Sequence, residues 1–232
     1  MRIGIMQPYF LPYIGYFQLI DFCDIFVLYD EIEYSKRGWI SRNRIQINGE
    51  AKVFSLHIEK SSDFMQIKEK HLAQSFDRKK LLRQFDGAYR KSKYWDQARV
   101  TLEEIIFYED NNLHSYIENS IMQICAYIGI ETKISRSSDI EAKNSLQGED
   151  RVLSICKAVK GLDYINPIGG IDLYDINRFK NHGINLKFLR SKLSPYDQGE
   201  KDFVPALSIV DLMANLDLTQ IRQVISSDFE IQ

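Results

Sequence analysis

The residues best suited to ligand chemistry lie in one polar and aromatic passage, residues 31–44. Four cations fall within nine residues there, interleaved with two aromatic side chains: Lys36, Arg37, Arg42 and Arg44, with Tyr34 and Trp39. A guanidinium pairs with phosphate or carboxylate through two parallel hydrogen bonds, and a flat ring stacks on a base or a sugar. The passage therefore predicts a site for an anionic, nucleotide-like ligand. A solvated loop whose charges guard an edge strand is the alternative interpretation.

A second candidate stretch, residues 7–17, follows the short apolar run Ile3–Met6. It contains Pro8 and Pro12 and then resumes with apolar residues at helical spacing, which predicts a strand, a rigid turn and a helix. In α/β proteins the loop after a strand faces the binding crevice, and the next helix offers free N–H groups there. Gly15, in the first turn of that helix, would let a ligand or a neighbouring backbone approach closely. The alternative is a tight turn filled with aromatic core residues.

Two further strand ends carry candidate residues. The run Asp24–Asp30 is apolar between its two acids, which is typical of a central strand buried on both faces. Asp30 then ends that strand beside the first loop, where it either takes part in the site or only caps the following turn. Later in the chain, Gly169 and Gly170 follow a short strand and would allow the main chain to approach an anion.

The elements that position these residues alternate along the chain. Residues 44–58 alternate apolar and polar side chains around Asn48-Gly49, which predicts a β-hairpin that extends the main sheet. Residues 64–129 have helical periodicity and predict a helical subdomain within a single domain spanning residues 1–232. Strand and helix patterns alternate in the last third, at 132–136, 151–160, 163–166, 173–182, 184–189 and 206–213, with a short helix after Asp217. This order predicts a Rossmann-like α/β fold with a mostly parallel sheet.

Composition limits the classes of function. The net charge of −2 over 232 residues provides no global field for nucleic acid or an anionic membrane. Cys23, Cys125 and Cys156 lack metal-ligand spacing and lie among apolar neighbours, so we expect buried thiols, no metal site and a reducing, cytoplasmic location. No apolar run approaches the roughly 18 residues of a membrane span, so no membrane insertion is expected. An oligomer is compatible with all of these features.

Four motifs together resemble the WbqC-like family of bacterial polysaccharide-locus proteins: IGIMQPYFLPYIGYFQLI, DIFVLYDEIEYSKRGWISRNRI, YINPIGGIDLYD and FVPALSIVDLM. They span essentially the whole chain in the expected order. The resemblance implies a part in the biosynthesis of O-antigen lipopolysaccharide and related surface glycans. It also implies transfer of an acyl or aminoacyl group, such as acetyl or glycyl, to an amino sugar on a nucleotide carrier. No cofactor is firmly implied beyond an acyl or aminoacyl donor or ATP.

The resemblance places many candidate residues in family motifs. The reacting groups would be Gln7, Tyr13, Tyr16 and Asp30. The nucleotide sugar would be bound by Pro8, Gly15, Tyr34, Lys36, Arg37, Trp39, Arg42, Asn43, Arg44, Asn166, Gly169, Gly170 and Gln198. Tyr196, Phe203, Pro205, Ser208 and Asp211 also belong to these motifs. An amine that attacks a carbonyl needs a base and donors for the developing oxyanion, for which Asp30 and Gln7 are the candidates. No nucleophile and base can be paired, which favours direct attack.

Two other functions stay open at this point. The loop Tyr13-Ile14-Gly15-Tyr16 is similar to the His-x-Gly-His loop of nucleotidyltransferases such as pantothenate synthetase and the class I synthetases. A nucleotidyltransferase or ATP-dependent ligase would therefore fit the same fold, although tyrosine cannot carry the positive charge of an imidazolium. In the third hypothesis, the aromatic residues form the platform of a non-catalytic sugar-binding module.

Overall fold

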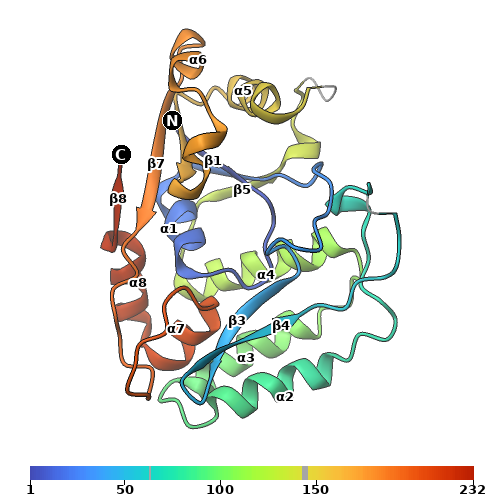
Figure 1. Ribbon diagram of the computed structural model, residues 1–232, viewed down its shortest axis with the longest axis vertical. Coiled ribbons are helices and arrows are strands. Elements are labelled where there is room, and N and C mark those ends of the chain that lie inside the picture. Colours follow the sequence, from blue (N-terminus) through green and yellow to red (C-terminus); the bar gives the residue numbers. More distant parts are fainter. Residues whose placement is uncertain (63, 143–145) are drawn as a thin grey trace.

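A computed structural model describes residues 1–62, 64–142 and 146–232 (Figure 1). Within these residues the central sheet has six strands in the order β5-β2-β1-β6-β7-β8. The strands are β1 (Arg2–Met6), β2 (Ile25–Leu28), β5 (Lys133–Arg136), β6 (Asp163–Pro167), β7 (Asn185–Ser191) and β8 (Phe229–Ile231). All neighbours pair in parallel except β7 and β8, which are antiparallel. The predicted Rossmann-like α/β fold is confirmed. The three-residue strand β8 was not predicted from the sequence.

Helices cover both faces of this sheet, each over a core of its own (Figure 1). One face packs against α1 (Ile14–Phe22), α4 (Leu113–Ile128) and α8 (Leu218–Ser227). The other packs against α5 (Gly148–Ala158) and α6 (Ile176–Asn181). In the first half of the chain β2 is added on one side of β1, and in the second half β6 is added on the other side. The strand order therefore reverses at β1. Ligands of open α/β sheets bind where the strand order reverses, at the carboxyl ends of the strands.

The predicted hairpin is present as β3 (Arg42–Ile47) and β4 (Glu50–Ser55), joined through Asn48 and Gly49. Both turn residues have positive φ, of 52° and 76°, as a tight two-residue hairpin turn requires. The expectation that the hairpin extends the main sheet is wrong, because its strands pair only with each other. Instead the hairpin packs against α2 (Arg78–Tyr89) and α7 (Ile209–Asn215), and both of these helices contact α3 (Trp95–Ile106).

Helix boundaries follow capping side chains. The α7 helix begins at Ile209, later than the predicted residue 206, because the Ser208 side chain accepts a hydrogen bond from the Val210 N–H. Likewise α6 begins after Asp175, whose side chain accepts from the Asn177 N–H. The short 3-10 helices are η1 (Ile67–Glu69), η2 (Ser137–Asp139) and η3 (Ile168–Leu173).

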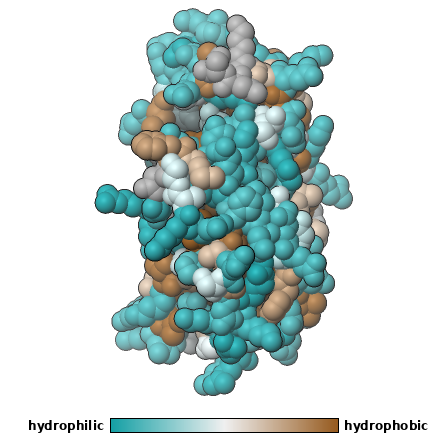
Figure 2. Space-filling view, turned by 90° about the vertical axis from the view of Figure 1, so that its right-hand side faces the viewer, coloured by the Kyte–Doolittle hydropathy of each residue, from teal (hydrophilic) through white to brown (hydrophobic). Residues whose placement is uncertain are grey.

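The three cysteines are buried free thiols, as predicted. In the described ranges, no helix has the length and apolar character needed to cross a membrane. The same residues contain no group of three or more His, Cys, Asp or Glu side chains that could hold a metal ion. Figure 2 shows that the face on the right of Figure 1 is largely hydrophilic, with apolar side chains in separate patches.

Candidate functional site

The opening loop, residues 7–13, leaves the carboxyl end of β1 and is clamped between two distant segments. Its Leu11 carbonyl accepts hydrogen bonds from Asn43 Nδ2 at 2.9 Å and from Ser208 Oγ at 2.7 Å. The next carbonyl in this clamp, that of Pro12, accepts from the Ile209 N–H at 2.8 Å. These bonds hold Leu11 at a φ of 44°, in the left-handed region that non-glycine residues rarely adopt. The loop therefore has one fixed shape, set by β3 and by the start of α7.

A cavity of about 180 Å³ lies against this loop. It is lined by Tyr9, Pro12, Tyr13, Trp39, Asn43, Arg44 and Ala206. The Arg44 guanidinium is anchored by one hydrogen bond, from Nη2 to the Ala206 carbonyl at 3.1 Å. Its buried Nε has no hydrogen-bond partner among the residues that the structure describes. The cavity thus combines aromatic walls with a cation that has unused hydrogen-bonding capacity.

Trp39 joins the two arginines of β3. The guanidinium carbon of Arg42 lies 5.4 Å from the centre of the Trp39 ring, and that of Arg44 lies 5.5 Å from it. The ring is 42% exposed, so part of its surface is open to a ligand. Arg42 also donates to the Gly38 and Arg37 carbonyls, which fixes the loop before β3. The structure therefore brings the opening loop together with Trp39, Arg42 and Arg44.

The other residues of the basic passage are placed differently. Lys36 and Arg37 are exposed beside the loop. Tyr34 is buried, and its hydroxyl shares a hydrogen bond of 2.7 Å with Ser41 Oγ. A stacking role for Tyr34 would need its ring to be free, whereas the ring lies in the core. Tyr34 therefore stabilises the loop before β3 from the side of the core.

The tyrosines of the opening loop divide into two groups. Tyr16 is buried, and its hydroxyl donates to the Gln7 carbonyl at 2.9 Å, so it fixes the strand end rather than facing the cavity. Tyr9 and Tyr13 line the cavity. Burial raises the pKa of both phenols, and the neighbouring Tyr13 adds to the shift of Tyr9. Both hydroxyls are therefore protonated near neutral pH and can donate to a carbonyl or phosphate oxygen. The Tyr9 hydroxyl is 3.4 Å from Oε1 of Gln7.

Gly15 allows a close approach, but to a side chain of the same loop. A β-carbon at Gly15 would lie 2.5 Å from atoms of the Tyr13 ring. The ring therefore covers the first turn of α1, where an anion was expected to bind. Glycine is therefore needed at position 15 because Tyr13 of the same loop packs against it.

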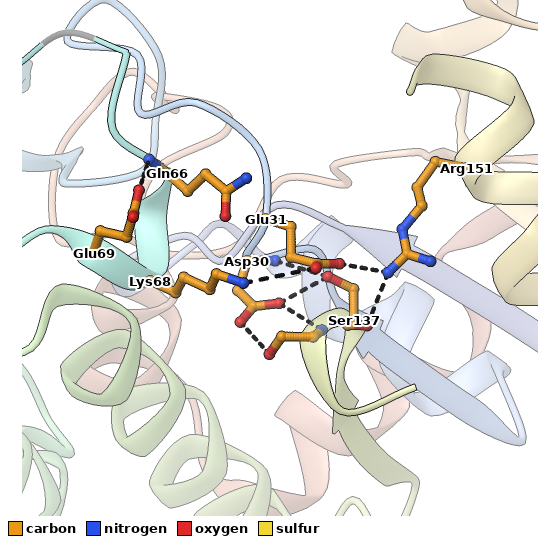
Figure 3. A network of polar contacts seen from close by, with 8 residues as sticks. Asp30, Glu31, Gln66, Lys68, Glu69, Ser137 and Arg151 are labelled. Carbon is orange, nitrogen blue, oxygen red and sulfur yellow. Dashed lines mark hydrogen bonds and ion pairs between the residues drawn. The ribbon is translucent and has the colours of Figure 1, made fainter. Parts of the chain in front are cut away.

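Asp30 is buried at the carboxyl end of β2, in the polar network of Figure 3. Its carboxylate accepts hydrogen bonds from the hydroxyls of Ser137 and Ser138, each at 2.7 Å, and from the Ser138 N–H at 3.0 Å. Burial alone would raise the pKa of this carboxyl, but the hydrogen bonds from Ser138 and Ser137 outweigh it and lower the pKa. A carboxylate held in this way is a weak base. These contacts favour the second interpretation of Asp30, in which its side chain stabilises a turn. That turn is η2, after β5, and not the turn that directly follows Asp30 in the sequence.

Beside Asp30, three charged side chains form a chain that sequence reasoning missed (Figure 3). Arg151 of α5 is 1% exposed and donates to Glu31 and to the Ser137 carbonyl. On its other side Glu31 lies 3.6 Å from Lys68 Nζ. The sequence shows Arg151 only as one more charge in the first turns of a helix, because its burial depends on contacts with Glu31 and Ser137, which are distant in the sequence or belong to another element. This chain ties α5 and η1 to the carboxyl edge of the sheet.

The glycine turn after β6 packs against its own strand. A β-carbon at Gly170 would lie 2.1 Å from Nδ2 of Asn166, whereas one at Gly169 would meet nothing within 4 Å. Asn166 is buried, and it accepts from the Tyr164 hydroxyl at 3.1 Å and donates to the Pro167 carbonyl. Gly170 is thus explained by close packing, while Gly169 alone keeps an open approach.

Gln198 belongs to a separate buried network. Its side chain donates to Asp211 at 2.9 Å and to the Val204 carbonyl, and it accepts from Gln46. Asp211 also accepts from Tyr89 and Tyr196. These bonds fold residues 196–206 back onto the hairpin and so position Ala206 in the cavity. The contacts of Gln198 are structural, and it does not line the cavity beside Trp39.

The structure is therefore a Rossmann-like α/β fold with an aromatic and cationic cavity against the loop after its first strand. The chain belongs to the WbqC-like protein family, whose model matches residues 7–223. It is 27% identical over 218 residues to the uncharacterised protein Rv1507c of Mycobacterium tuberculosis (strain ATCC 25618 / H37Rv), covering 93% of this chain and 94% of that protein. No solved structure matches the chain.

Proposed function

We propose that the protein is a transferase that moves an acyl or aminoacyl group, such as acetyl or glycyl, to a nucleotide-linked amino sugar of bacterial surface-polysaccharide biosynthesis. The single observation that best supports this proposal is the pairing of Arg44 with Trp39 in a cavity beside the opening loop. A guanidinium with free donors suits an anionic oxygen, and an exposed indole suits a sugar ring or a base. The opening loop supplies neutral phenols within the same cavity.

The side chains near the cavity suggest separate roles in a direct attack of the sugar amine on the acyl carbonyl. In that step the nitrogen forms a bond to the carbonyl carbon, the leaving group departs with the bonding electrons, and the amine loses a proton. Tyr9 and Tyr13 would donate hydrogen bonds to the developing oxyanion, because their raised pKa values keep them protonated. Asp30 is unsuited to accept the proton, since its carboxylate already accepts three hydrogen bonds. A free amine attacks without a strong protein base, and the proton that it then loses passes to the departing group or to solvent water.

The alternative of nucleotidyl transfer receives less support. It needs an open helix N-terminus for a triphosphate, whereas the Tyr13 ring covers the first turn of α1. A sugar-binding module without catalysis would use the same cavity. It differs from a transferase in one respect, because a module binds the amino sugar without changing its mass.

The proposal is tested by calorimetric titration with UDP- and dTDP-linked amino sugars, followed by mass spectrometry of the sugar after incubation with acetyl or glycyl donors. We expect saturable binding that Arg44→Ala weakens about tenfold or more, as loss of a charge-assisted contact implies. Lys79→Ala is the matched control, because Lys79 is an exposed cation on α2 away from the cavity. Absence of binding at millimolar concentration would contradict the proposal. Binding without any gain of mass would favour the sugar-binding module.

A further inference from the structure

A larger cavity, of about 740 Å³, lies along the loop before β3. It is lined by Tyr34, Lys36, Ser41, Arg42, Ser55, Leu56, Ile58, Glu59, Lys60, Ser61, Ser62 and Lys70. The described lining residues comprise four cations, one carboxylate and four serines with their hydroxyl groups. The segments that form it lie on the right-hand side of Figure 1, on the hydrophilic face of Figure 2. Its lining suits an anionic ligand several times larger than the first cavity holds.

Lys70 is the unusual group in this cavity, because it is a lysine with only 2% exposure. Its ammonium donates to Ser61 Oγ at 2.8 Å and to the Ser62 carbonyl at 2.6 Å. It also lies 5.4 Å from the centre of the Tyr34 ring. All of these described partners are neutral. A buried ammonium costs free energy unless an anion compensates it, so a bound anion would complete this site.

Arg42 connects the two cavities. It lines the larger one, and its guanidinium lies over the Trp39 ring, whose other arginine neighbour, Arg44, lines the smaller one. One indole therefore separates a small aromatic cavity from a large basic cavity. A ligand in which a sugar ring is joined to a diphosphate would place the ring in the smaller cavity and the diphosphate in the larger one. A nucleotide-linked sugar contains this pair of groups, with its nucleoside on the far side of the diphosphate.

We propose that the larger cavity binds the diphosphate of a nucleoside diphosphate, held by Arg42, Lys60 and Lys70, while the sugar enters the cavity beside Trp39. This inference rests on the proposed function and deepens it. It adds Lys60 and Lys70 to Arg42 of the sequence-predicted candidates, whereas Arg37 lines neither cavity. Glu59 also lines this cavity, and its carboxylate would repel phosphates placed beside it and so restrict their position.

The test is calorimetric titration of the full chain with inorganic pyrophosphate, UDP and uridine at two salt concentrations. We expect pyrophosphate and UDP to bind, uridine to bind about tenfold more weakly or not at all, and affinity to fall as salt rises. Lys60→Ala should weaken UDP binding about fivefold or more, since it removes one charged donor. Lys60 is exposed, so this variant should fold. Lys79→Ala is the control of equal charge change and should bind UDP as the unaltered protein does.

Two results would overturn the inference. One is failure of pyrophosphate and UDP to bind at millimolar concentration, and the other is equal UDP affinity in the Lys60→Ala and Lys79→Ala proteins. The outcomes also separate this inference from the proposed function. If UDP-amino sugar binds and is acylated while pyrophosphate does not bind, only the diphosphate site is wrong. If pyrophosphate binds through Lys60 but no amino sugar is acylated, the diphosphate site stands without the transferase.

Discussion

The Tyr13 side chain lies directly over Gly15, so that a β-carbon on Gly15 would be 2.5 Å from two ring carbons of Tyr13 and from its hydroxyl oxygen. This contact decides two properties of the candidate site. It turns the Tyr13 phenol along the wall of the cavity, and it covers the first turn of α1. The strand, turn and helix at the start of the chain therefore present a tyrosine to the ligand, where related loop geometries present bare backbone N–H groups.

Gly15→Ala should consequently lower the free energy of unfolding by about 1–3 kcal/mol, because the ring or the helix must shift to make room. Gly87→Ala in α2 is the matched control, since a β-carbon there would meet nothing within 4 Å. The control should be neutral or stabilising by about 0.5–1 kcal/mol, as for other exposed helical glycines. Urea denaturation of both variants measures the difference. Equal stability of the two variants would show that the Tyr13 ring gives way freely.

Asn43 and Ser208 share one acceptor, the Leu11 carbonyl, and should therefore be energetically coupled. Either Asn43→Ala or Ser208→Ala alone leaves the carbonyl with one donor, while the double substitution leaves it buried and unpaired. We expect the double variant to lose about 1–2 kcal/mol more than the sum of the single losses. A double-mutant cycle from denaturation curves gives this coupling. Simple additivity would mean that the two side chains do not hold the loop together.

Asp30 should stabilise the protein mainly above pH 4. Its pKa is lowered in the folded state, so its contribution is complete above the unfolded pKa, about 3.9, and is lost as pH falls through the folded pKa. Asp30→Asn should cost about 1–3 kcal/mol at pH 7, and the difference from the unaltered protein should shrink below pH 4. Denaturation midpoints measured from pH 3 to pH 7 check this. A difference that is constant across that range would contradict a role for the ionised carboxylate.

The two glycines after β6 should behave differently. Gly170→Ala places a β-carbon 2.1 Å from Asn166 Nδ2, whereas Gly169→Ala meets nothing within 4 Å. We expect thermal unfolding of the Gly170→Ala protein to shift to lower temperature, with little change for Gly169→Ala. Adding Asn166→Ala to Gly170→Ala should restore part of the loss by removing the crowded carboxamide. Without any restoration, the cause would lie in the backbone of η3 instead.

Local sequence patterns predicted the parallel sheet, the hairpin and most helices, because each depends on the periodicity of its own residues. The separate sheet of the hairpin was not predictable, since pairing partners are chosen by tertiary packing. The same limit explains the site residues. The grouping of Trp39 with Arg42 and Arg44 follows from their closeness in sequence, and the structure retains it. Arg151 and Lys70 are buried by packing against other segments of the chain, which the pattern of charges along the sequence does not reveal.

The most direct test of the central claim is a fluorescence titration with a UDP-linked amino sugar. Trp39 is 42% exposed beside the cavity, whereas Trp95 is 3% exposed in the core, so a ligand that stacks in the site should change the emission of Trp39. We expect a saturable change in the unaltered protein that is lost in Trp39→Phe and weakened about tenfold in Arg44→Ala. A change of equal size in the Trp39→Phe protein, or no change at millimolar ligand, would contradict the assignment of this cavity as the sugar site.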